Sequence, residues 1–213
     1  MNDNGESAKR APDARMVDRM LFFSDAVFAI VLTLLVLELR VPEVEGDDAL
    51  AAALGGLTGK FVAFAASFAL VAIFWAAHMT ITRRLAIFDW PVAWLNLIFL
   101  FTIAVMPFVS ALIGEHGAFG LAWRIYCATL VAASLAQSVL VLALTRDKGR
   151  LVGGITGREI GWRLSRALSP GIAFAVGLWL SYAGEARLSA FCWVLIPLVM
   201  ILARLLFNPN RAT

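Results

Sequence analysis

A long apolar run with one acidic residue near its start constrains this chain more than any other feature. The run extends from Arg19 to Glu38, and between Asp25 and Leu37 only Thr33 is polar. A bilayer core needs about 20 apolar residues per helix, so the run predicts a membrane-spanning helix. An ionised carboxylate within such a helix costs about 2.5–3.5 kcal/mol on insertion scales. We therefore expect Asp25 to face protein, water or a partner rather than lipid.

The rest of the sequence predicts an all-α integral membrane protein. Hydrophobic residues make up 61% of the 213 residues, which is more than soluble domains contain. Six stretches are long and apolar enough to span a bilayer, at about residues 19–41, 57–81, 91–113, 119–145, 164–183 and 188–207. We expect one six-helix domain over residues 19–207, between a disordered tail at 1–18 and a short tail at 208–213. Pro107 and Pro197 fall inside two of the spans and predict kinks there.

The distribution of the 18 Lys and Arg residues predicts the orientation of these spans. Most of them lie in the terminal segments and in the loops near Arg83 and Arg146. The exceptions are Arg40, Lys60, Arg124 and Arg187. By the positive-inside rule, both termini are cytoplasmic, as in a multi-pass protein of the cell membrane. Glu38 then lies at the outer end of the first span, where it either faces an outer vestibule or ends the helix in water.

Helical geometry separates Asp25 from an aliphatic stripe on the first span. At 100° per residue, Ile30, Leu34 and Leu37 fall within about 60° of one another, whereas Asp25 lies about 140° from Ile30. Repeated around a symmetry axis, the stripe would form a narrow apolar neck. In a single chain it would be an ordinary lipid-facing or packing surface. Thr33, beside the stripe, can offer its hydroxyl to an ion or to its own helix backbone.

A set of polar residues is distributed over the first three spans. Trp75 and His78 share one face of the second span, and Asn96 lies in the third. Together with Ser24 and Asp25 they supply complementary donors and acceptors. These predict a buried network that ties three helices together. The alternative is a proton relay through Asp25 and His78.

These motifs resemble the transmembrane protein 175 family of lysosomal and prokaryotic potassium channels. The matching residues are Arg19-x-x-x-Phe23-Ser24-Asp25, the following Ala-Val-Phe-Ala-Ile and Thr33-Leu-Leu-Val-Leu-Glu38, then Trp75-x-x-His78, Asp89, Asn96 and Met106-Pro107-Phe108. The resemblance covers about the first half of the chain and is only topological beyond Gly114. It implies a homotetramer in which four copies of the first helix line a central pore.

The resemblance also implies roles for individual residues. Ile30 would form the tightest apolar constriction, Leu34 and Leu37 would extend the neck, and Thr33 would add a polar layer. The residues expected to form a structural polar network are Arg19, Phe23, Ser24, Asp25, Trp75, His78 and Asn96.

The implied function is a cation channel that prefers potassium. The sequence holds no Thr-Val-Gly-Tyr-Gly filter, so we expect the neck to select by dehydration, with modest selectivity. The alternative is a proton-coupled secondary transporter or a proton leak that uses Asp25 and His78. Against a transporter, we find no internal repeat and no paired broken helices.

An enzyme is not expected, because Gly-x-Ser-x-Gly and His-Glu-x-x-His motifs are absent from the sequence. The expected ligand is permeant K⁺, with no cofactor and no metal site. The expected partners are further copies of the chain, the lipid bilayer and monovalent cations, and no nucleic acid.

Overall fold

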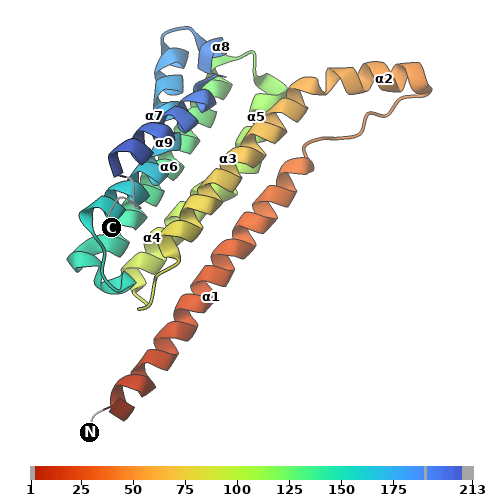
Figure 1. The fold of residues 1–213 in the computed structure, drawn as a ribbon. Coiled ribbons are helices and arrows are strands. Elements are labelled where there is room, and N and C mark those ends of the chain that lie inside the picture. Colours follow the sequence, from red (N-terminus) through yellow and green to blue (C-terminus); the bar gives the residue numbers. More distant parts are fainter. Residues whose placement is uncertain (1–2, 190, 208–213) are drawn as a thin grey trace.

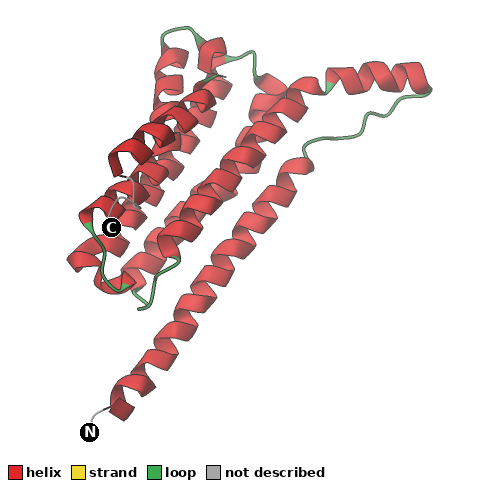
Figure 2. Cartoon of the chain, in the orientation of Figure 1, coloured by secondary structure: helices red, strands yellow, loops and turns green. Residues whose placement is uncertain are grey.

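The computed structural model describes residues 3–189 and 191–207, and its regular elements are all helices. Figures 1 and 2 show α1 running along one side of a bundle that the later helices form. In chain order the elements are α1 (Asp3–Val36), α2 (Asp47–Gly56), α3 (Thr58–Thr82), α4 (Trp90–Ala104), α5 (Met106–His116), α6 (Gly120–Gly149), η1 (Arg150–Val152), α7 (Gly157–Tyr182), α8 (Ala186–Ser189), η2 (Cys192–Val194) and α9 (Leu195–Phe207). The predicted all-α class is confirmed, while the expected tail at 208–213 lies outside the described residues.

Within the described ranges, five stretches are long and apolar enough to cross a membrane. They are Asp13–Val36, Thr58–Thr82, Trp90–His116, Gly120–Val152 and Gly157–Tyr182. The expected sixth span is divided instead among α8, η2 and α9. The 13 residues of α9 extend over only about 20 Å, less than the bilayer core of about 30 Å. Pro197 lies in the first turn of α9, the part of a helix that tolerates a residue without a backbone N–H.

The start of α1 differs from the expectation. The helix begins at Asp3, so residues 3–18, expected as a disordered tail, are helical in the structure. Val17 is only 4% exposed and packs in a cluster with Ile81 of α3 and Leu144 of α6. Burial of this apolar side chain gives the extension a contact that favours order over a free tail.

The end of α1 was also predicted wrongly. The helix ends at Val36, five residues before the expected boundary at residue 41. Two tight backbone hydrogen bonds follow, from Leu37 N to the Leu34 oxygen at 3.1 Å and from Leu39 N to the Val36 oxygen at 3.0 Å. Such i to i−3 bonds close the last turn of a helix and end it. The segment then leads to α2, which projects away from the bundle in Figure 1 and has no buried residue.

The other boundaries follow local signals. At Pro107, where a kink was expected, the span is interrupted: α4 ends at Ala104 and α5 begins at Met106, with the proline in its first turn. The start of α7 precedes the expected residue 164. There the side chain of Thr156 accepts a hydrogen bond from Glu159 N at 3.3 Å, which caps the helix before Gly157.

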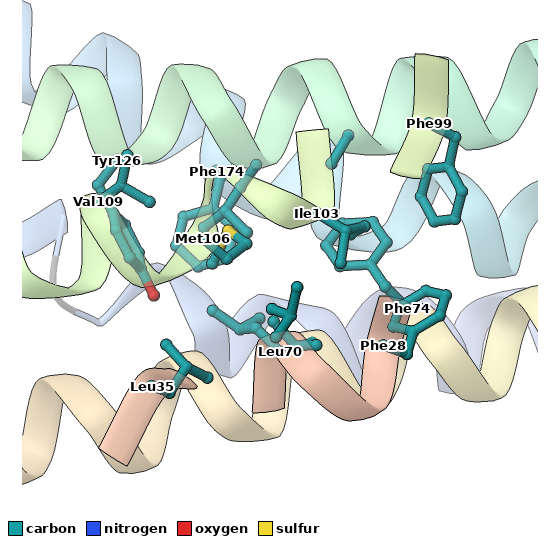
Figure 3. Packing of buried hydrophobic residues seen from close by; sticks show 14 of the residues in the cluster. Phe28, Leu35, Leu70, Phe74, Phe99, Ile103, Met106, Val109, Tyr126 and Phe174 are labelled. Atoms are coloured by element: carbon teal, nitrogen blue, oxygen red, sulfur yellow. The ribbon is translucent and has the colours of Figure 1, made fainter. Parts of the chain in front are cut away.

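A continuous apolar core joins α1 to the rest of the bundle. From α1 it contains Phe28, Val31 and Leu35, and these residues pack against α3, α4 and α5. The Phe99 ring packs against both Phe28 and Phe74, with centroids 6.0 Å and 6.2 Å apart, and Figure 3 shows these three residues in the same core as Ile103. These side chains are spaced by three or four residues on each helix, which gives every helix one face toward the core.

A small polar contact joins α6 to α7 where Pro170 interrupts the hydrogen bonding of α7. The Ser134 hydroxyl donates to the Ala167 oxygen at 2.5 Å and accepts from Gly171 N at 2.9 Å. Ser134 and Gly171 approach so closely that a Cβ at position 171 would overlap the serine side chain. Close approach of small residues is a common way for membrane helices to pack.

We therefore expect Gly171→Ala to lower the free energy of unfolding by about 1–3 kcal/mol through overpacking. Thermal unfolding in detergent, followed by tryptophan fluorescence, measures the change. Gly59→Ala is the matched control, because a Cβ there meets nothing within 4 Å and alanine favours a helix over glycine. Equal unfolding midpoints for the two variants would contradict this account of the α6–α7 contact.

Candidate functional site: the first helix and its polar anchor

The membrane-spanning part of α1 has one buried face and one exposed face. Ser24, Phe28 and Leu35 are buried at helical spacing. Ile30 is 56% exposed and Leu34 is 41% exposed. The structure therefore places both aliphatic residues on the side of α1 that the rest of the chain leaves uncovered.

The outer end of the aliphatic stripe formed by Ile30, Leu34 and Leu37 extends past the end of α1. Thr33 is exposed, and its hydroxyl donates to the Ile30 oxygen at 2.8 Å. Leu37 is exposed but lies in the turn after α1, beyond the last helical residue. Glu38 is half-buried and borders a small cavity with Lys60, whose Nζ lies 2.9 Å from Glu115 Oε1. Glu38 thus lies beside an ion pair that links α3 to α5.

A chain of hydrogen bonds joins the buried face of α1 to α3 and α4. Asn96 Nδ2 donates to Ser24 Oγ at 2.9 Å, and Ser24 Oγ donates to the Met20 oxygen at 2.9 Å. His78 Nε2 lies 2.8 Å from Asn96 Oδ1. The amide oxygen can only accept, so the histidine must donate from Nε2. Ser24, His78 and Asn96 are all buried, and the bonds satisfy groups that have no access to water.

Aromatic contacts hold the histidine ring in place. His78 stacks on Phe99 with ring centroids 5.6 Å apart and an interplanar angle of 13°. Phe28 of α1 packs against the same histidine at 5.8 Å. The ring is therefore enclosed by α1 and α4, as well as hydrogen-bonded to α4.

Asp25 makes a separate link to α3. Its Oδ1 accepts a hydrogen bond from Trp75 Nε1 at 3.0 Å, and the carboxylate is exposed. Within the described part of the chain, no hydrogen bond joins Asp25 to His78.

Two residues expected in the polar network lie outside it. Arg19 and Phe23 are exposed, and none of the hydrogen bonds described above involves Arg19. The structure therefore brings Ser24, His78 and Asn96 together and leaves Arg19 and Phe23 outside that group.

Ion pairs hold the end of the bundle that carries the loop 83–89 and the segment 146–156, which runs from the end of α6 through η1 to the start of α7. We call this end the basic end. Buried Arg163 donates from Nη1 to the Ile81 oxygen at 3.2 Å and pairs with Glu159 at 2.9 Å. Glu159 also pairs with Arg84 at 3.1 Å. A bond from Arg163 to the last turn of α3 satisfies a carbonyl that the helix end leaves free.

A cavity of about 550 Å³ lies among α1, α3 and α7 near the basic end. Asp25, Trp75 and His78 border it, together with Arg83 and Arg166. The two arginines were not among the residues expected at a site. Arg166 nevertheless gave a signal in the sequence, because a charged residue inside a predicted span is unusual. Among the residues that the structure describes, no group of three or more His, Cys, Asp or Glu side chains could hold a metal ion.

We expect Asn96→Ala to destabilise the protein by about 1–3 kcal/mol, because it leaves buried partners of Asn96 unpaired. Thr129→Ala is the control, since the described hydrogen bond of Thr129 stays within α6, to the Ile125 oxygen at 2.9 Å. Both variants can be compared by thermal unfolding in detergent. A shift for Asn96→Ala no larger than that of the control would show that the network does not hold α1.

Comparisons with known proteins match the part of the chain that contains this site. Residues 19–107 match the family model described as "Endosomal/lysosomal potassium channel TMEM175". A potassium channel of Streptomyces collinus is 35% identical over 132 residues, which cover 60% of this chain and 64% of that protein. The aligned part therefore spans less than two thirds of that relative.

Two further comparisons extend the likeness. An endosomal/lysosomal proton channel TMEM175 of Danio rerio is 27% identical over 125 residues, 58% of this chain and 24% of that protein. The crystal structure of a lysosomal potassium-selective channel TMEM175 homologue from Chamaesiphon minutus superposes with a TM-score of 0.73 at 26% identity, covering 89% of this chain and 98% of that one. The match over residues 19–107 and the similarity of the fold both relate this chain to the TMEM175 family.

Proposed function

We propose that this protein is a cation channel that prefers potassium, with the exposed face of α1 lining a pore shared by several copies of the chain. One observation carries the proposal. The buried face of α1 is anchored through Ser24 and Asn96, while Ile30 and Leu34 stay exposed on the same helix. A helix with one face anchored and another free is suited to line an axis. The matched relatives are named as channels, which supports a channel function over an enzymatic one.

The proposed assembly is a homotetramer with Ile30 at its narrowest ring. Leu34 and Leu37 continue the apolar surface outward, and Thr33 adds hydroxyl groups beside it. Such a neck selects by dehydration, because K⁺ loses its water shell more cheaply than Na⁺, and it can close by dewetting. We expect modest selectivity, since no ring of backbone carbonyls replaces the lost water.

In the proposed membrane arrangement, the basic end and both termini face the cytoplasm of the cell. The excess of Lys and Arg in the segments 83–89 and 146–156 supports this orientation. The opposite end carries Glu43, Glu45, Asp47 and Asp48, and acidic residues near a pore mouth raise the local cation concentration. In this arrangement the segment from α8 to α9 provides the sixth span, and Glu38 borders the outer vestibule.

Proton permeation is a second candidate, because one specific observation favours it. Asp25 and His78 border the same cavity at the basic end, and both side chains can carry protons. The Danio rerio relative is named as a proton channel. The direct hydrogen bond of His78 is to Asn96, so a relay from Asp25 would need water within the cavity.

We expect Ile30→Asn to lower the preference for K⁺ over Na⁺, because a polar ring reduces the difference in dehydration cost. Reversal potentials of the purified protein in planar bilayers measure the change. Ile201→Asn is a matched control, since Ile201 is 60% exposed, similar to Ile30, but lies on α9. Unchanged selectivity in Ile30→Asn, in a conducting protein, would remove Ile30 from the pore.

The proton candidate has its own test. If His78 carries protons, His78→Gln should abolish proton flux into liposomes under a pH gradient and leave K⁺ current in place. Glutamine can still donate a hydrogen bond to Asn96, so the variant separates titration from packing. Full proton flux in His78→Gln would exclude this histidine from the path.

A further inference from the structure

Arg166 is a charged side chain on a membrane-spanning helix. It lies in α7, one helical turn beyond Arg163, which bonds to the last turn of α3. Its Nε is enclosed and has no hydrogen-bond partner among the described residues. The guanidinium carbon lies 6.0 Å from the centre of the Trp162 ring. An ionisable residue within a membrane-spanning helix normally pairs with a charge or lines a polar path, and Arg166 lines a cavity.

The surroundings of Arg166 favour an anion. The cavity of about 550 Å³ beside it is also lined by Arg83, at the end of α3, and by Asp25 of α1. Asp25 is a negative group, but one of its oxygens already accepts the bond from Trp75. His78 borders the cavity and donates to Asn96. Two guanidinium groups against one engaged carboxylate leave an excess of positive charge.

The walls of the cavity favour a lipid over an ion from water. Leu21, Trp75 and Met79 line it, and Trp75 and Met79 are 37% and 47% exposed on a membrane-spanning helix. Apolar side chains that a membrane-spanning helix leaves uncovered offer a surface on which acyl chains can pack. A phospholipid can lay its chains along these residues and bring its phosphate to the arginines. A small soluble anion would have no contact with this apolar wall.

We propose that the cavity among α1, α3 and α7 binds the headgroup phosphate of an anionic phospholipid, with Arg166 and Arg83 as its charge partners. Guanidinium groups pair with phosphate through charge-assisted hydrogen bonds. Because Leu21 and Asp25 belong to α1, the lipid would bridge the first helix to α7. The inference does not depend on the proposed channel function, since its readout is lipid binding.

Native mass spectrometry of the purified full-length protein tests the proposal. Phosphatidylglycerol is titrated against phosphatidylcholine for the wild type, Arg166→Gln and Arg83→Gln. Arg158→Gln is the matched control, because Arg158 is exposed on the same helix but does not line the cavity. We expect Arg166→Gln to weaken phosphatidylglycerol binding about tenfold, the loss of one charge-assisted hydrogen bond. Arg83→Gln should also weaken it, while the control retains wild-type binding.

Three results would overturn the proposal. The first is that Arg166→Gln and Arg83→Gln bind phosphatidylglycerol as tightly as the Arg158→Gln control does. The second is that millimolar glycerol 3-phosphate displaces the lipid, which would assign the cavity to a soluble anion. The third is that Arg166→Gln changes the number of subunits but leaves lipid binding unchanged, which would assign the cavity to a second copy of the chain. If Arg166→Gln fails to give a monodisperse protein, Arg83→Gln decides alone, since Arg83 is exposed at a helix end.

Discussion

The hydrogen-bonded chain from His78 through Asn96 to Ser24 is the constraint on which the placement of α1 depends. Polar groups inside a membrane protein must find partners within the protein, because lipid offers none. These three side chains satisfy one another only when Ser24 faces α4. The chain of bonds therefore sets the rotation of α1 about its own axis, and Phe28 and Leu35 follow it into the core.

That rotation has two consequences on other faces of α1. It leaves Ile30 and Leu34 uncovered, which is the basis of the proposed pore. It also turns Asp25 toward Trp75 and the cavity that Arg166 borders. One helix therefore takes part in both the candidate neck and the candidate lipid site. A change in its position would affect the two together.

Much of the fold could be predicted because membrane helices leave strong local signals. The limits of α3, the break at Pro107 and the all-α class agree with apolar length and proline chemistry. The errors lie at ends that other interactions decide. A Thr156 cap starts α7 early, and tight turns end α1 at Val36. Hydropathy does not register such contacts, because it sums the apolar character of a segment and contains no hydrogen-bond geometry.

By itself, the sequence determined that the chain is a multi-pass membrane protein and which helices carry its polar residues. The length of an apolar segment and the charges beside it are local properties of the sequence, so they can be recognised without knowing the tertiary structure. Only the tertiary structure decided which polar groups meet. Asn96 bonds to Ser24 across 72 positions, and Arg166 shares a cavity with Asp25. Helical periodicity places a residue on a face of its own helix, but packing between distant helices decides what that face contacts.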